Sequence, residues 1–508
     1  MPETWWRGAA IYQVYLRSFA DGNGDGTGDL AGLRARLPYI ADLGMNAIWL
    51  NPWYPSPMAD GGYDVADYRD IHPDFGTLAE AEEFINEAHA LGIKVIIDVV
   101  PNHSSVASEW FQEALRDPSK RDRFWFADEP ANEWKSIFGG PAWSQVDDGQ
   151  WYLHLFDPGQ PDFNWTNPEV HQEFHDVLRF WFDRGVDGIR IDSAALLGKD
   201  FAGGDPDGYT DLPEVHEIYR SWRRLSDEYD QRILIGEVWF ADQERFASYL
   251  RPDEMHTAFN FDFLAAPWDC AKLRASIEQT LATHIPLGAP PTWVLSNHDV
   301  ARVVTRYGRA ETSWDHGERR DGVPSDLELG YRRSRAAALL AMALPGSIYV
   351  YQGEELGLPE VDAIPDELRQ DPMFTRSGGT VPGRDGCRVP MPWSGEEPPF
   401  GFGAGDTWMP QPADWRKLTV ETQEADLGSM LNLYRTALTI RREHLGDGSL
   451  TWLDLGPQVL AFTRESGLTC VVNFGPDPVR LPAHGRLLLA SGSLDGDALP
   501  AETAVWLA

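Results

Sequence analysis

The stretch Gly188-Ile-Arg-Ile-Asp-Ser-Ala194 decides how the fold of this chain is interpreted. Its strand-forming residues predict a β-strand that ends near Asp192, with Arg190 two residues earlier on the same face. A guanidinium beside a carboxylate favours the charged form, so we expect Asp192 to be ionised and oriented. Such a carboxylate can act as a nucleophile. The same pair of residues also occurs as a purely structural ion pair at the end of a strand.

Strand-like and helix-like segments alternate on both sides of this stretch. The expected strands lie at residues 10–15, 47–50, 94–100, 188–192, 233–239, 256–263, 292–299 and 347–351. A Thr77-x-x-Glu80 capping box marks the start of one intervening helix, and Asn167 before Pro168 marks another. Alternating strands and helices predict a parallel sheet with crossover helices. Eight such units close a barrel, so we expect an α/β fold of the (β/α)8 TIM-barrel class.

Two segments depart from this alternation. Residues 104–166 are rich in Trp, Pro, Asp and Gly and predict a small lobe inserted after the third strand. Residues 448–508 contain two strand-like runs on either side of Glu465-Ser-Gly467, which predicts a hairpin within a β-sandwich. The expected organisation is therefore a barrel at 1–103 and 167–447, an inserted lobe at 104–166 and a C-terminal β-sandwich at 448–508.

Composition restricts the partners and the compartment. The net charge is −36 over 508 residues, which argues against nucleic acid and anionic membrane surfaces as partners. The three cysteines are far apart and show no metal-ligand spacing, as in a reduced cytosolic protein. We see neither a secretory signal pattern nor a run of about 18 apolar residues. A cytoplasmic location is therefore expected, and the oligomeric state is left open.

A short loop near the N-terminus carries oxygen-bearing side chains at alternate positions, separated mainly by glycines. They are Asp21, Asn23, Asp25 and Asp29. Carboxylate and amide oxygens that converge in a tight turn suit a hard cation. The loop is not a standard EF-hand, because its twelfth residue is Gly32 instead of a bidentate Glu. We expect a structural Ca²⁺ here, with Mg²⁺ as an alternative metal and a solvated turn as the alternative without metal.

Three carboxylates stand at or near the ends of expected strands: Asp192, Glu237 and Asp299. The carboxyl ends of barrel strands are the face on which such folds build active sites. Glu237 follows an apolar run, so burial should raise its pKa and allow it to donate a proton. Two carboxyl groups in opposite protonation states are what glycosidic bond cleavage with retention requires. The alternative, a metal site that uses His103 and His298, is disfavoured because Arg190 would repel a cation.

These motifs resemble the conserved blocks of the α-amylase superfamily, glycoside hydrolase family 13, over nearly the whole chain. The matching blocks, in order, are Asp98-Val-Val-Pro-Asn-His103, Gly188-Ile-Arg-Ile-Asp192, Glu237-Val-Trp239 and Asn297-His-Asp299. Gln160-Pro-Asp-Phe-Asn164 resembles the block of the α-glucosidase and oligo-1,6-glucosidase branch. By this resemblance, Asp192 is the nucleophile, Glu237 is the acid/base and Asp299 stabilises the transition state.

The resemblance also implies a set of substrate-binding residues and completes the metal loop. The implied substrate-binding residues are Tyr63, Asp64, His103, Arg190, His298, Arg302 and Arg388. Within this set, Asp64 would pair with Arg388 and grip the hydroxyl at the non-reducing end of the sugar. In the metal loop, Thr27 would add its carbonyl oxygen to the side chains of Asp21, Asn23, Asp25 and Asp29.

The expected activity is that of an exo-acting retaining α-glucosidase on small α-glucosides and short oligosaccharides, with transglycosylation as a side activity. In the family, the residue after the nucleophile is associated with linkage preference, and the small Ser193 favours α-1,4 bonds. An α-glucosyl transferase or a sucrose or maltose isomerase would use the same glucosyl-enzyme and is the first alternative. A catalytically silent binding relative is the second, which the presence of all three carboxylates disfavours.

Overall fold

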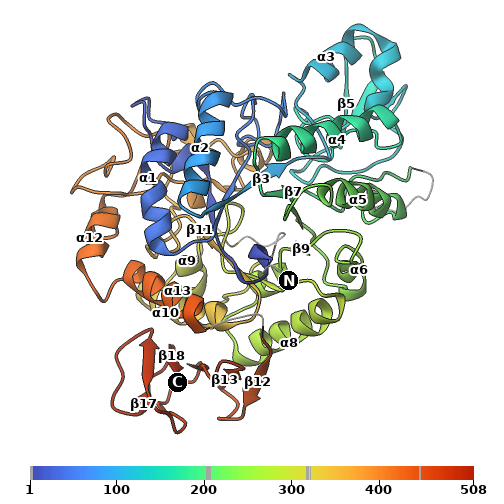
Figure 1. Cartoon of the computed structure of the whole chain (residues 1–508). Coiled ribbons are helices and arrows are strands. Elements are labelled where there is room, and N and C mark those ends of the chain that lie inside the picture. Colours follow the sequence, from blue (N-terminus) through green and yellow to red (C-terminus); the bar gives the residue numbers. More distant parts are fainter. Residues whose placement is uncertain (1–3, 202–207, 316–319, 321, 445–447) are drawn as a thin grey trace.

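Eight parallel strands form the centre of the computed structural model, which describes residues 4–201, 208–315, 320, 322–444 and 448–508 (Figure 1). The strands follow the order β10-β11-β1-β2-β3-β7-β8-β9. Their bounds are β1 Ala10–Val14, β2 Ala47–Leu50, β3 Lys94–Val99, β7 Gly188–Ile191, β8 Ile233–Gly236, β9 Thr257–Ala258, β10 Thr292–Val294 and β11 Ser347–Tyr351. Helices surround this sheet, so the predicted (β/α)8 class is confirmed.

The barrel is nearly closed, and the gap lies between β9 and β10. Pro290 and Pro291 directly precede β10, and proline has no N–H to donate to a neighbouring strand. Side chains cross this gap instead. The Thr257 hydroxyl donates to the Pro290 carbonyl at 2.8 Å, and the Thr292 hydroxyl donates to the Ala258 carbonyl at 2.7 Å. These two side-chain bonds hold β9 and β10 together, although the two strands share no backbone ladder.

The helices begin where the sequence signals place them. The hydroxyl of Thr77 accepts from the Glu80 N–H, and the Glu80 carboxylate accepts from the Thr77 N–H, so the predicted capping box is confirmed. Asn167 caps the next predicted helix, with Pro168 as its first residue. The longer helices are α1 Leu30–Leu43, α2 Leu78–Ala90, α4 Pro168–Asp183, α5 Pro213–Ser226, α8 Cys270–Leu287, α10 Leu327–Ala343 and α13 Met430–His444. None of the described helices is long and apolar enough to cross a membrane.

Two further units lie at opposite ends of the barrel (Figure 1). The inserted lobe contains α3 Glu109–Arg116 and a three-stranded antiparallel sheet of β4 Phe126–Ala127, β5 Trp143–Gln145 and β6 Trp151–Leu153. At the other end, an antiparallel sheet comprises β12 Leu450–Leu453, β13 Val459–Arg464, β14 Thr469–Asn473, β16 Leu487–Ala490 and β18 Thr503–Leu507. A two-stranded ribbon of β15 Val479–Arg480 and β17 Ala498–Leu499 accompanies it. The hairpin predicted around Glu465–Gly467 joins β13 to β14.

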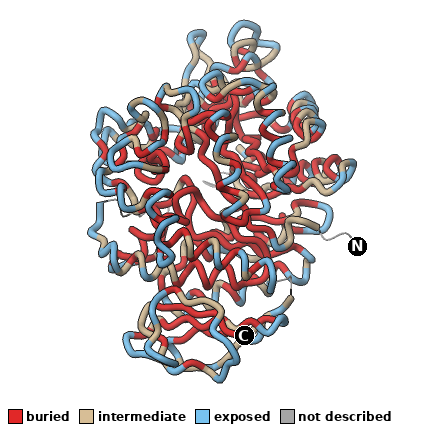
Figure 2. The backbone as a smooth tube through the Cα atoms, turned by 60° about the vertical axis from the view of Figure 1, so that its left-hand side comes forward, coloured by how far each residue is buried: buried red, intermediate tan, exposed pale blue. Residues whose placement is uncertain are grey.

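The C-terminal sheet packs on α10, and the buried residues run continuously through the barrel toward it (Figure 2). The Trp506 indole donates to the Leu339 carbonyl at 3.1 Å, and Arg464 donates to the Ala343 carbonyl at 2.7 Å. Both donors lie in the C-terminal sheet and both acceptors lie in α10. The small unit therefore shares buried polar contacts as well as apolar surface with the barrel.

Candidate active site

Arg190, in β7, lies at the centre of a cluster of carboxylates at the mouth of the barrel. Its Nη1 donates to Asp192 at 2.7 Å and lies 3.4 Å from Asp98, while its Nη2 lies 2.8 Å from Glu237. The guanidinium is only 2% exposed, so solvent screens these interactions little. The ends of β3, β7 and β8 thus bring three acidic side chains to a single cation.

This sharing changes the electrostatics expected from the sequence. Burial raises the pKa of Asp192, the nearby Glu237 carboxylate raises it further, and Arg190 only partly opposes the two effects. The expectation that Arg190 is sufficient to keep Asp192 ionised is therefore too simple. Because the Glu237 carboxylate bonds to the same guanidinium, Arg190 does not offset the effect of burial on the pKa of Asp192.

The backbone after the nucleophile candidate also contributes to the pair. Ser193 has a φ of 46°, in the left-handed region that residues other than glycine seldom adopt. In this conformation its N–H donates to Glu237 Oε2 at 2.9 Å. Ser193 therefore connects the end of β7 to the carboxylate that follows β8. Strained backbone residues of this kind are common at functional sites.

A chain of hydrogen bonds orients the aromatic side of the site. The Tyr63 hydroxyl donates to Asp98 at 2.7 Å and lies 2.7 Å from Nε2 of His298. On the other side of the imidazole, Nδ1 lies 2.7 Å from the Gln13 amide nitrogen. Burial lowers the pKa of His298 well below its usual range, so the ring is neutral at neutral pH. His298 thus holds Tyr63 in place by hydrogen bonding, without adding a charge.

Asp299 is held by two arginines of a distant loop. Arg388 Nη2 lies 2.9 Å and Arg384 Nη1 lies 3.2 Å from Asp299 Oδ1. Burial alone would raise the pKa of Asp299, but His298 and the two arginines hold it well below the usual range. Because His298 is neutral, we ascribe this effect to the arginines. Asp299 is therefore ionised beside the Asp192–Glu237 pair.

The carboxylate that pairs across the closed end of the site is Asp60. Arg384 Nη2 donates to Asp60 at 2.6 Å. Asp64, in contrast, accepts from the Ser56 hydroxyl and from backbone N–H groups of its own loop. The expected pairing of Asp64 with Arg388 is therefore wrong. Asp64 stabilises a turn, because three donors of its own loop already bond to its carboxylate.

These side chains line a pocket with a volume of about 100 Å³. Its polar lining is Asp60, Tyr63, His103, Asp192, Ser193, Glu237, Asp299 and Arg384, and its apolar lining is Ile137, Phe138, Phe156, Trp239 and Met373. A lining that combines charged groups with flat or aliphatic side chains suits a polyhydroxylated ring. Burial lowers the pKa of His103 to about 3, so this histidine is also a neutral hydrogen-bonding group.

The predicted substrate-binding residues that do not line the pocket are Asp64, Arg190, His298, Arg302 and Arg388. Arg302 donates to the carbonyls of Gln352 at 3.0 Å and Cys387 at 2.9 Å, and thereby anchors the loop that carries Arg384 and Arg388. Arg388 donates to the His298 carbonyl at 2.8 Å and to Asp299. Both arginines therefore act on the site through the residues that they hold.

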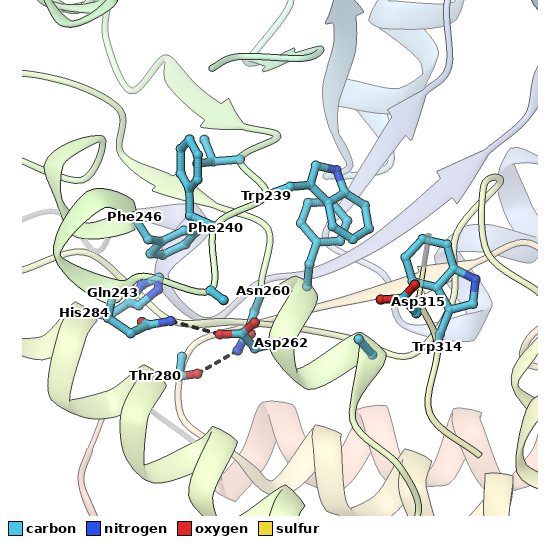
Figure 3. A pocket seen from close by; sticks show the side chains of 14 residues that line it. Trp239, Phe240, Gln243, Phe246, Asn260, Asp262, Thr280, His284, Trp314 and Asp315 are labelled. Atoms are coloured by element: carbon cyan, nitrogen blue, oxygen red, sulfur yellow. Dashed lines mark hydrogen bonds between the residues drawn. The ribbon is translucent and has the colours of Figure 1, made fainter. Parts of the chain in front are cut away.

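A second pocket, of about 280 Å³, shares Trp239 with the catalytic pocket (Figure 3). The Trp239 indole donates to Glu237 at 3.0 Å and stacks on Phe261, so one side chain separates the two spaces. Polar groups line the second pocket, among them Gln243, which donates to Asp262 at 2.9 Å. It therefore offers room for a polar group on the acid/base side of the catalytic pocket.

The expected metal loop folds as a tight turn whose oxygens also accept backbone N–H groups. Asp21 accepts from Gly24 and Gly26, and Asp25 accepts from Thr27. Asp29 caps α1 and accepts from the Gly22, Asn23 and Gly32 N–H groups. In the described residues, no cluster of three His, Cys, Asp or Glu side chains able to hold a metal is found. The carboxylates of Asp21 and Asp25 still fit Ca²⁺, because each of their oxygens accepts a single hydrogen bond and keeps a further lone pair.

Sequence reasoning missed three charged residues of the site, Asp60, Asp98 and Arg384, as well as its apolar lining residues Ile137, Phe138, Phe156 and Met373. Asp98 is fully buried and accepts from the Trp49 indole at 2.8 Å as well as from Tyr63. It stands at the start of a motif block already recognised, so its position at a strand end was an available signal. Asp60 and Arg384 also lie next to recognised motifs, but no sequence pattern indicates that these two residues form a pair.

A family model described as the catalytic domain of alpha-amylase matches residues 13–448. The chain belongs to this family, glycoside hydrolase family 13, and is a glycoside hydrolase. Asp192 directly follows β7 and Glu237 directly follows β8, and both line the pocket together with Asp299.

The chain is similar to α-glucosidase-like members of this family. A probable alpha-glucosidase of Rhizobium meliloti (strain 1021) is 36% identical over 514 residues, which cover 93% of this chain and 90% of that protein. The solved alpha-glucosyl transfer enzyme XgtA has a TM-score of 0.85 at 37% identity, with 99% of each chain covered. The trehalulose synthase MutB of Pseudomonas mesoacidophila MX-45 has a TM-score of 0.87 at 29% identity, also with 99% of each chain covered.

Proposed function

We propose that this protein is an exo-acting, retaining α-glucosidase that hydrolyses terminal α-glucosidic bonds of short oligosaccharides and small α-glucosides. The observation that carries the proposal is the single guanidinium of Arg190, which bonds to both Asp192 and Glu237. Sharing one guanidinium supports the short carboxyl separation, about 5 Å, that double displacement uses. The pairing of Asp60 with Arg384 supports exo action, because it closes the end of the pocket opposite the reacting bond.

In this mechanism, Asp192 attacks the anomeric carbon while Glu237 donates its proton to the leaving glycosidic oxygen. The C–O bond to the leaving group breaks as the glucosyl-enzyme bond forms. Glu237, now ionised, then takes a proton from water, whose oxygen attacks the same carbon and releases Asp192. Asp299, ionised beside the pair, would stabilise the positive charge that develops on the sugar ring. Ser193 after the nucleophile favours α-1,4 bonds, by the resemblance to the family.

The test combines one variant with product stereochemistry. Asp192→Asn should reduce kcat by at least about a thousandfold, because the nucleophile is lost, with an unchanged melting temperature. Proton NMR of the wild-type reaction on maltose should show α-glucose as the first anomer. Release of β-glucose, or full activity of Asp192→Asn, would overturn the proposal.

Transfer of the glucosyl group to a sugar acceptor is the second candidate function. Two observations favour it: solved relatives that are named as a glucosyl transfer enzyme and a trehalulose synthase, and the second pocket beyond Trp239. An acceptor hydroxyl would then replace water in the second displacement. Glucose released in proportion to the maltose consumed would support hydrolysis. New disaccharides or trisaccharides with little free glucose would support transfer or isomerisation.

We also propose that the loop with Asp21, Asn23, Asp25, Thr27 and Asp29 binds a structural Ca²⁺. Five oxygen donors within nine residues support this, and the cap that Asp29 forms on α1 explains how the metal would stabilise the fold. The loop packs against the segment around Ala404 and Asp406, far along the chain. A bound cation would therefore stabilise the junction between α1 and the loop that follows β11.

A further inference from the structure

We propose that Arg376 is a positioning residue that ties the inserted lobe to the loop after β11 and thereby sets the pocket's preference for short substrates. The inference rests on the proposed glucosidase function and names a determinant of its substrate length. Arg376 is the last residue of α11 Pro372–Arg376. Its side chain crosses from this short helix to the lobe, where Nε donates to the Gly139 carbonyl at 3.0 Å and Nη2 donates to the same oxygen.

Both segments that Arg376 joins line the catalytic pocket. On the lobe side, Ile137 and Phe138 directly precede the glycine whose carbonyl accepts the two bonds. On the loop side, Met373 lies one helical turn before Arg376. The Arg376 bridge therefore connects two segments that both line this pocket. A cation–π contact of Arg384 with the Phe138 ring, at 5.2 Å, also joins the lobe segment to this loop, but it lies on the loop beyond α11.

The lobe segment is a tight turn built to present that carbonyl. Gly139 and Gly140 both have positive φ values, of 92° and 77°, which residues with a side chain rarely adopt. The Ser136 N–H donates to the Gly140 carbonyl at 3.0 Å and closes the turn. A Cβ on Gly140 would lie 3.1 Å from Nη2 of Arg376, so the guanidinium fits closely against the turn.

A second contact extends the bridge toward the closed end of the pocket. Arg376 Nη1 lies 3.7 Å from the carboxylate of Asp157. The Asp157 N–H donates to the Gln160 side-chain carbonyl at 2.9 Å, and the Gln160 amide donates to Asp60 at 3.0 Å. Arg376 is therefore connected through two residues to the carboxylate that pairs with Arg384. Loss of the bridge should loosen this end of the pocket as well as its mouth.

The direction of the effect follows from the geometry of the walls. Ile137 is 45% exposed at the mouth, where it would meet any sugar unit beyond the one in the pocket. Tied walls enclose a single ring closely and collide with additional units. Released walls would contact the small substrate less well and obstruct the longer chain less. The bridge should therefore favour disaccharides over longer maltooligosaccharides.

The test compares chain-length selectivity in Arg376→Ala, Arg376→Lys and a control. In Arg376→Ala, the KM for maltose should rise about tenfold, in line with the loss of a charge-assisted hydrogen bond, while kcat changes less than about threefold. The kcat/KM for maltoheptaose should change less than about threefold, so the maltose-to-maltoheptaose ratio falls at least about threefold. Arg376→Lys keeps one donor for the Gly139 carbonyl and should recover most of the ratio.

Arg369→Ala is the matched control, because Arg369 lies in the same loop and donates within it, to the carbonyls of Pro382 and Asp362. It should leave the ratio at the wild-type value. A uniform loss of activity on all chain lengths in Arg376→Ala, or an unchanged ratio, would overturn the proposal.

Hydrogen–deuterium exchange separates this proposal from the proposed function. Loss of the bridge should speed exchange at least about threefold at the amides of residues 136–142, a readout that needs no substrate. If the wild-type enzyme released glucose from none of these substrates, the glucosidase function would have failed, and this measurement would still decide the bridge. Unchanged exchange in Arg376→Ala would refute the positioning role.

Discussion

At the scale of single residues, the arginines decide how the acidic site works. Arg190 bonds two carboxylates of the site and lies near a third, and Arg384 contacts Asp60, Asp299 and Asp371. A buried carboxylate cluster would otherwise be costly, since each buried charge requires a partner. The cations thus permit several acidic groups to remain close together without water. Cleavage of a glycosidic bond requires such neighbouring carboxyl groups, one on each side of the bond.

Asp60 and Asp64 provide a residue-scale prediction, because they are four residues apart and only one of them lines the pocket. Asp60→Asn should raise the KM for maltose by about 10- to 100-fold with a smaller change in kcat, since a charged hydrogen-bond acceptor is lost from the gripping end. Asp64→Asn should leave KM within about twofold of the wild-type value, although its turn is weakened. Steady-state kinetics of both variants measure this difference. The reverse order of effects would restore the pairing expected from sequence.

The sequence predicted the three carboxylates but could not choose between neighbouring polar residues. Arg384 and Arg388 flank the short helical turn Asp385–Cys387, and this turn directs only Arg384 to the pocket. Similarly, Gly61 and Gly62, with φ values of 59° and 104°, separate Asp60 from Asp64 and turn the chain between them. Which of two neighbouring side chains faces the pocket depends on the direction of the backbone, and a sequence motif does not specify that direction.

At the scale of elements, periodicity and caps predicted the long helices and strands well, while short segments were predicted less well. The strand expected at 256–263 is only β9 Thr257–Ala258, and α7 Phe261–Ala265 follows. Asn260 ends the extended segment, because its side chain accepts from the Phe263 N–H and caps α7. A run rich in phenylalanine suits either structure, so the local pattern did not decide between them.

The calcium loop gives the prediction for this scale. A chelator such as EDTA should lower the melting temperature by about 5 °C or more, because removal of a bound ion removes its stabilisation of the folded state. Asp25→Ala should abolish the response to Ca²⁺, since Asp25 is exposed and its other contacts stay within the loop. Differential scanning calorimetry with and without about 1 mM Ca²⁺ is the measurement. This concentration is close to the dissociation constants of weakly binding extracellular calcium modules, about 1 mM at the weak end.

Asp29→Ala is a less clean variant for this purpose, because it also removes the cap of α1, which costs about 1 kcal/mol even without metal. The same melting temperature for the wild-type protein with calcium and with chelator would contradict a structural metal in this loop.

At the scale of the whole molecule, a buried carboxylate connects the barrel to α13. Glu354 follows β11, accepts from the Ser296 hydroxyl after β10 and accepts from the Tyr434 hydroxyl of α13 at 2.9 Å. Burial raises the pKa of Glu354 to about 7, with the adjacent Glu355 adding to the effect and the two hydroxyl donors opposing it. The folded state therefore binds a proton more tightly than the unfolded chain.

This proton makes the stability of the whole chain depend on pH. Since the folded pKa is raised, the contribution of Glu354 is fully present below about pH 4.5 and is lost as pH rises through about 7. Glu354→Gln mimics the protonated carboxyl, so between pH 5 and 9 it should gain up to about 3 kcal/mol over the wild-type protein. Denaturant unfolding at several pH values measures the free-energy difference. Glu367→Gln is the control, because Glu367 is exposed. If the difference in unfolding free energy between Glu354→Gln and the wild-type protein did not change with pH, this role of Glu354 would be excluded.

By itself, the sequence determined the fold class and the places of Asp192 and Glu237 directly after strands, whereas Asp299 lies five residues beyond the end of β10. Both depend on local physics: hydrophobic periodicity selects strand or helix, and the carboxyl ends of parallel strands meet at one edge. Only the tertiary structure decided that Asp60 pairs with Arg384, that Arg190 is shared between carboxylates and that Arg376 bridges the pocket walls. These pairings join segments up to 324 residues apart, and a buried charge finds its partner through packing in three dimensions, whatever the spacing along the chain.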